Sequence, residues 1–124
     1  MRSLDNAVWK LSIPILLAAA TYFVSSAYAH AIVLSATPGI HQTIRGPDVP
    51  VKLRFNSRID PKRSRLTLIA SGGKEAALGI AGESSGDSLV SEAKGLKSGP
   101  YVLRWQVLAV DGHITRGEVP FQVE

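Results

Sequence analysis

The sequence contains no cysteine, and its only methionine is the initiator Met1. Without cysteine the chain forms no disulfides, so an exported domain of this size has to rely on its hydrophobic core. The thiolate ligands of structural zinc sites and blue-copper centres are excluded as well. Without methionine beyond residue 1 the chain also lacks the thioether ligands that suit Cu(I). These absences narrow the metal chemistry to nitrogen and oxygen donors.

Several other patterns are missing. No run of like charge is longer than Lys62-Arg63, and no basic stripe alternates with aromatic residues, which argues against a nucleic-acid partner. We find no Ser–His–Asp or Cys–His arrangement, no paired-carboxylate signature and no glycine-rich phosphate loop. We therefore expect a binding protein and not an enzyme.

The N-terminal residues 1–29 have the order of a secretory signal peptide. Arg2 and Lys10 provide a basic start, residues 11–24 are mostly apolar, and Ala27-Tyr28-Ala29 forms an A-x-A cleavage site. The apolar run is too short for a persuasive membrane span. We expect cleavage after Ala29 and a periplasmic location. Removing 29 of the 124 residues leaves 95, enough for one domain over residues 30–124 with a net charge near +3.

Cleavage at this point makes His30 the new N-terminal residue. A terminal histidine can chelate one metal ion through its α-amine and its imidazole, which titrate near pH about 8 and about 6.5. The alternative is that histidine is simply the residue that cleavage happens to expose.

The remaining chain predicts an all-β fold, a small Greek-key sandwich or barrel. Turn residues recur about every 8–12 positions, and apolar residues alternate with polar ones between them. Strands are expected over residues 31–36, 49–56, 65–70, 75–80, 88–93, 101–110 and 115–123. Trp105 is interpreted as a core residue.

Asp111-Gly112-His113 follows the strongest predicted strand. Asp111 and His113 can point the same way, and Gly112 permits a tight turn between them. With the two nitrogens of His30 they would form an N₃O set, which suits Cu(II). The alternative is a plain hairpin turn with Asp as a turn former. His41 lies in a loop after Pro38-Gly39 and is interpreted as a solvated histidine, although it could lie near the same end.

The chain resembles the periplasmic copper-resistance protein C (CopC) family over essentially all of residues 30–124. The resemblance rests on five segments: His30-Ala31; Ser35-Ala36-Thr37-Pro38; Val51-Lys52-Leu53-Arg54-Phe55-Asn56; Gly99-Pro100-Tyr101-Val102-Leu103-Arg104-Trp105; and Gln106-Val107-Leu108-Ala109-Val110-Asp111-Gly112-His113 with Gly117 and Phe121.

The resemblance implies a fold similar to cupredoxins and immunoglobulin domains. It also implies one Cu(II) ion bound by His30, through amine and ring, by Asp111 and by His113. The function implied is copper resistance or homeostasis, in which a monomer sequesters copper or delivers it to an inner-membrane transporter of the CopD type. Some family members carry a Met- and His-rich loop for Cu(I), which this chain lacks.

Two other functions remain open on the sequence alone. Copper oxidases acting on polysaccharide also use an N-terminal histidine, but they need a second histidine and an open coordination position, which Asp111 would fill. A metal-free, immunoglobulin-like interaction module is the other alternative.

Overall fold

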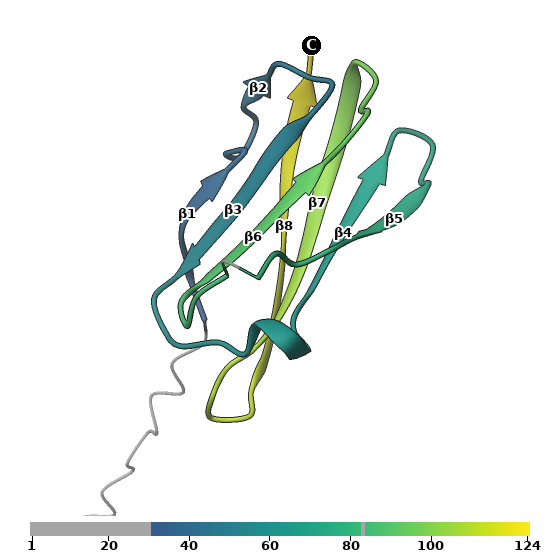
Figure 1. Cartoon of the computed structure of the whole chain (residues 1–124). Helices are drawn as coiled ribbons and strands as arrows, with labels where there is room; N and C mark the ends of the chain where they lie inside the picture. Colours follow the sequence, from purple (N-terminus) through teal and green to yellow (C-terminus); the bar gives the residue numbers. More distant parts are fainter. Residues whose placement is uncertain (1–30, 83) are drawn as a thin grey trace, which may run out of the picture.

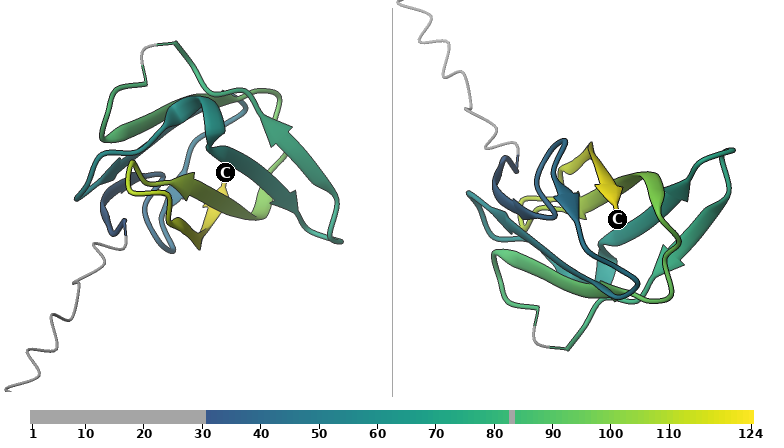
Figure 2. Two further views of the ribbon diagram at one scale, coloured as in Figure 1. Left: turned by 90° about the horizontal axis from the view of Figure 1, so that it is seen from below. Right: turned by 90° about the horizontal axis from the view of Figure 1, so that it is seen from above.

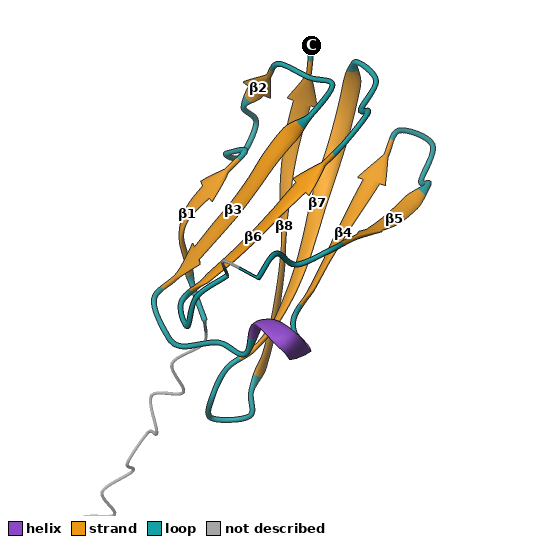
Figure 3. Cartoon of the chain, in the orientation of Figure 1, coloured by secondary structure: helices purple, strands orange, loops and turns teal. Residues whose placement is uncertain are grey.

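Two β-sheets pack face to face in this computed structural model, which describes residues 31–82 and 84–124 (Figures 1 and 3). The first sheet has the order β1-β3-β6 and the second the order β2-β8-β7-β4-β5. The strands are β1 (Val33–Thr37), β2 (Thr43–Ile44), β3 (Val49–Phe55), β4 (Arg65–Ala70), β5 (Glu75–Leu78), β6 (Ser88–Ala93), β7 (Gly99–Leu108) and β8 (Ile114–Val123). The predicted all-β sandwich is confirmed. The predicted signal peptide and His30 lie outside the described residues.

Alternation of apolar and polar residues decides which face of each strand enters the core. In β3 the buried residues are Val49, Val51, Leu53 and Phe55, and the residues between them are exposed. The inward residues of β7 and β8 follow the same period of two, as the sequence predicted. Burial of these side chains from both sheets forms one continuous core.

Trp105 anchors the core between the two sheets, and its burial is confirmed at 7% exposure. Its indole meets the Phe55 ring edge to face, with 5.3 Å between centroids and 69° between planes. On the other side it lies against Gly117, its register partner on β8, where an added Cβ would overlap the indole. Gly117 therefore makes room for the largest side chain of the core.

One end of the sandwich, here called the hairpin pole, is formed by residues 109–113 between β7 and β8, residues 56–60 after β3, and the beginning of β1. Figures 1 and 2 agree in placing these segments together, and Figure 1 shows them at the end opposite the C-terminus. Residues 56–60 cross from the first sheet to the second: Phe55 belongs to β3, whereas Ile59 forms a bridge with Ala109. Hydrogen bonds from Asp60 N–H to the Leu108 carbonyl and from Val110 N–H to the Arg58 carbonyl fix this crossing.

Two short elements differ from the sequence analysis. The two-residue strand β2 pairs in parallel with the end of β8 and was not predicted, because two residues carry no periodic pattern. The other is a 3₁₀ turn, η1 (Pro61–Arg63), which is capped by Asp60 Oδ1 accepting from Lys62 N–H at 3.0 Å. Among the described residues, no helix is long and apolar enough to span a membrane.

The Trp105–Gly117 contact predicts a large effect of one methyl group. We expect Gly117→Ala to lower the free energy of unfolding by about 1–3 kcal/mol, because the added Cβ overlaps an indole that the core holds in place. Thermal unfolding followed by Trp105 fluorescence measures this. Gly79→Ala, at a site with no atom within 4 Å of the added Cβ, is the matched control. Equal melting temperatures for the two variants would contradict the prediction.

Candidate metal site

The β7–β8 hairpin presents a turn whose backbone is held by its own hydrogen bonds. Ala109 N–H donates to the His113 carbonyl at 2.8 Å, and Gly112 N–H donates to the Ala109 carbonyl at 2.9 Å. Gly112 adopts φ 91°, a left-handed conformation that favours glycine. The crossing segment adds a further bond to Val110, so the turn is tied both to its own strands and to its neighbour.

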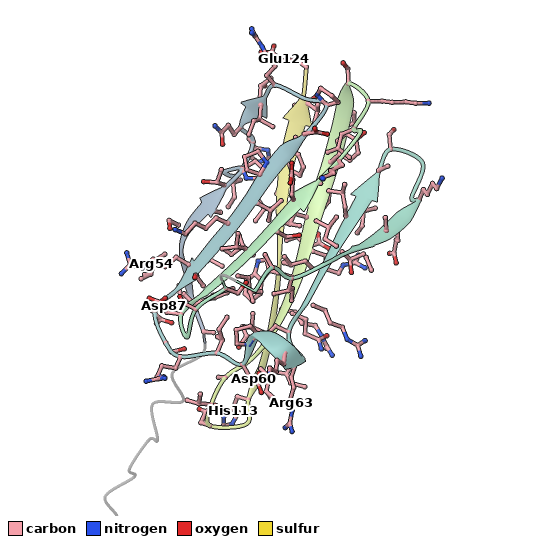
Figure 4. All side chains as sticks on the ribbon, viewed as in Figure 1. Arg54, Asp60, Arg63, Asp87, His113 and Glu124 are labelled. Atoms are coloured by element: carbon pink, nitrogen blue, oxygen red, sulfur yellow. The ribbon has the colours of Figure 1, made fainter. Side chains whose placement is uncertain are left out.

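Within this turn the structure brings Asp111 and His113 together. Figure 4 shows His113 at the end of the sandwich opposite Glu124. Asp111 Oδ1 accepts a hydrogen bond from His113 N–H at 3.0 Å, and Asp111 Oδ2 lies 3.0 Å from His113 Nδ1. Both side chains are partly open to solvent, with 43% and 41% exposure. The His113 Nδ1 atom itself is buried.

The same contacts affect the acidity of Asp111. The backbone N–H of His113 is the main cause that lowers the pKa of the Asp111 carboxyl, the His113 side chain lowers it further, and partial desolvation opposes both. Asp111 is therefore ionised throughout the range in which imidazole gains or loses its proton. The pair combines one carboxylate with one imidazole on a fixed turn, which is a donor set that binds divalent transition metals.

Within residues 31–82 and 84–124, no three His, Cys, Asp or Glu side chains are grouped so that they could hold a metal ion. The third predicted ligand, His30, lies outside the described residues. The residue that follows it, Ala31, is buried with 2% exposure. Ile32 is fixed by two hydrogen bonds: its N–H donates to Asn56 Oδ1 at 2.8 Å, and its carbonyl accepts from Asn56 N–H at 2.9 Å.

Asn56 has a structural role that the sequence analysis did not identify. Its side chain holds the beginning of the described chain at the hairpin pole, next to the segment that crosses between the sheets. The sequence analysis placed Asn56 at the end of the expected strand 49–56, whereas β3 ends at Phe55 and Asn56 follows it.

His41 lies elsewhere, so the idea that it could share the end with Asp111 and His113 is wrong. Its N–H donates to the carbonyl of Pro120, seven residues beyond His113 and therefore about 20 Å along β8. It is exposed and adopts φ 60°. Its interpretation as a solvated loop histidine is confirmed. The physical reason is the pairing of the segment around Gln42 with the second half of β8.

The fold and this turn define the class of the protein: a small, cysteine-free β-sandwich with an Asp-x-His pair at the end of its last hairpin. The chain belongs to the CopC family, whose CopC domain model matches residues 33–124. Copper resistance protein C of Xanthomonas campestris pv. juglandis is 30% identical over 118 residues, which cover 89% of this chain and 92% of that relative.

Solved structures agree with this assignment. The crystal structure of CopC from Methylosinus trichosporium OB3b has a TM-score of 0.69 and 29% identity, covering 77% of this chain and 94% of that one. The crystal structure of PcoC from Escherichia coli, described as a methionine-rich copper resistance protein, has a TM-score of 0.67 and 22% identity, covering 77% and 100%. The latter likeness concerns the fold, since this chain has methionine at residue 1 alone.

The lowered pKa of Asp111 predicts a specific acid response of the metal-free protein. Because the folded-state pKa lies below the unfolded value of about 3.9, ionised Asp111 contributes stability that is fully present above that value. This contribution is lost as the pH falls through the folded-state pKa. We expect the NMR titration of the Asp111 carboxyl to have its midpoint below the ordinary value.

Asp111→Asn is the control for this titration, because its amide oxygen can still accept from His113 N–H but carries no charge. Below about pH 4, the loss of stability that comes from protonation of Asp111 should be present in the parent and absent in Asp111→Asn. A carboxyl midpoint at or above the ordinary value would show that the hydrogen bonds of the turn do not form in solution.

Proposed function

We propose that the mature chain, beginning at His30, is a periplasmic Cu(II)-binding protein of copper resistance or homeostasis. One Cu(II) ion is held by the amine and ring of His30, by Asp111 and by His113. The protein sequesters this ion or delivers it to an inner-membrane transporter of the CopD type. Membership of the CopC family supports the copper chemistry. The observation that carries the site is the Asp111–His113 pair on its fixed turn.

The donor chemistry of this pair supports a metal ion in place of a plain turn. Asp111 Oδ2 and His113 Nδ1 lie 3.0 Å apart, so one carboxylate oxygen and one ring nitrogen are adjacent on the same turn. The carboxylate and the ring are both partly exposed. Nitrogen and oxygen donors without thiolate or thioether favour Cu(II) over Cu(I).

The third ligand is proposed from the position of its neighbours. Ala31 is buried, and Ile32 is fixed to Asn56, at the pole that also carries the hairpin. In a chain that begins at His30, the residue before Ala31, we therefore expect the terminal amine at this pole, where it can bind the ion. Cleavage after Ala29 and the domain boundary at His30 are parts of the same proposal.

The free amine gives the sharpest test of the ligand set. A chain beginning at Ala29 converts the His30 amine into an amide and removes one donor, so its affinity for Cu(II) should fall at least 100-fold relative to the chain beginning at His30. Competition titration followed by quenching of Trp105, the single tryptophan of residues 30–124, measures this. Both chains should unfold at the same temperature without metal. Equal affinities would remove the amine from the site.

Copper should also stabilise the fold through His113. An ion that binds only the folded state stabilises it by about 4 kcal/mol at a free concentration one thousand times the Kd. We expect His113→Ala to lose most of the resulting increase in melting temperature and His41→Ala to retain it. Calorimetry with and without one equivalent of Cu(II) tests the pair. If His113→Ala melts as high as the parent with copper, His113 is not a ligand.

A further inference from the structure

The buried hydroxyl groups of this protein divide into two sets. Those of the three most buried serines are hydrogen bonded: Ser64 donates to the Asp60 carbonyl, Ser88 pairs with Ser85, and Ser91 donates to the Gly79 carbonyl. Two other hydroxyl oxygens, Ser57 Oγ and Thr115 Oγ1, are buried and have no hydrogen-bond partner among the described residues. A buried hydroxyl without a partner is unfavourable and requires an explanation.

Both exceptions lie at the hairpin pole. Thr115 follows His113 by two residues at the start of β8, on the inward face that continues through Gly117 and Val119. Its register partner on β7 is Val107, which is fully buried. Thr115 is the second residue of β8 and lies two residues after His113, which ends the turn.

Ser57 faces the same end from the crossing segment. The alternation that buries Leu53 and Phe55 in β3 continues through Ser57 to Ile59, which is 3% exposed. Ser57 is therefore turned inward. It also follows Asn56 directly, the residue whose side chain and backbone hold Ile32.

The two hydroxyls are thus both buried at this end of the domain, Thr115 two residues after His113 and Ser57 next to Asn56, which holds Ile32. The N–H groups of metal-bound amines and imidazoles usually donate hydrogen bonds to protein oxygens that surround the metal ligands. We propose that Ser57 and Thr115 are positioning residues for copper, whose hydroxyl oxygens accept hydrogen bonds from the N–H groups of the copper ligands. This inference rests on the proposed Cu(II) site.

The proposal gives two effects of opposite direction for the same substitution. Thr115→Val and Ser57→Ala remove a hydroxyl that has no partner in the metal-free protein, so the metal-free melting temperature should stay the same or rise. The affinity for Cu(II) should fall by about 10–100-fold, the usual cost of losing a hydrogen bond to a metal ligand. The Cu(II) electron paramagnetic resonance spectrum should change as well, because the ligand orientation is no longer fixed.

Two further variants serve as controls in the chain beginning at His30. Thr115→Ser keeps the hydroxyl and should retain the parent's affinity and spectrum. Ser91→Ala removes a hydroxyl that is bonded to the Gly79 carbonyl, so it should lower the metal-free melting temperature and leave the affinity unchanged.

The outcomes separate this proposal from the one on which it rests. If the parent chain does not bind Cu(II), the proposed function fails. If the parent binds and both Thr115→Val and Ser57→Ala bind with unchanged affinity and spectrum, the positioning role is overturned, and water satisfies the two hydroxyls. If these variants lose metal-free stability as Ser91→Ala does, the hydroxyls are structural and the proposal is also overturned.

Discussion

The antiparallel pairing of β7 with β8 is the constraint on which the rest of this structure depends. The ladder joins ten residue pairs, from Gly99 with Val123 to Leu108 with Ile114, and so runs nearly the full length of the sandwich. Such a ladder fixes the side-chain alternation of both strands at once. It buries Trp105 against Gly117 and delivers the turn with Asp111 and His113 to one end. The position of the candidate site is thus set by the register of the core.

The hairpin pole is also where the two sheets are joined. The chain leaves β3 in the first sheet, crosses through residues 56–60 and bonds to the end of β7 in the second. Asn56, at the start of this crossing, holds Ile32 beside it. A few consecutive residues therefore determine how the beginning of β1 lies relative to the last hairpin. In a domain without disulfides, this backbone connection provides the order that a metal site at the pole requires.

Much of the fold could be predicted from the sequence because its strands carry a strong period of two. The inward residues of β3, β7 and β8 were identified in this way, including Trp105. Turn chemistry located the Asp111-Gly112-His113 hairpin, and the pairing of Asp111 with His113 followed from their spacing. That His30, Asp111 and His113 bind a metal ion remains a prediction.

What could not be predicted depended on tertiary pairing and not on local pattern. The strand β2 exists only because β8 offers a free edge to Thr43 and Ile44, and the same pairing takes His41 away from the hairpin pole. The role of Asn56 needs a partner 24 residues earlier in the chain, which no local rule supplies. Ser57 and Thr115 read as ordinary polar residues until their burial is known.

The strands nearest the two halves of the proposed site belong to different sheets: β1 to the first and the β7–β8 hairpin to the second. An ion bound by His30 and by Asp111 would therefore act as a cross-link between the sheets. It would close a loop of about 80 residues, a length at which restricting the unfolded chain stabilises a fold by about 4–5 kcal/mol in the case of a disulfide. In a chain with no cysteine, the metal would take the topological place of an inter-sheet disulfide, with the difference that this cross-link opens whenever the ion leaves.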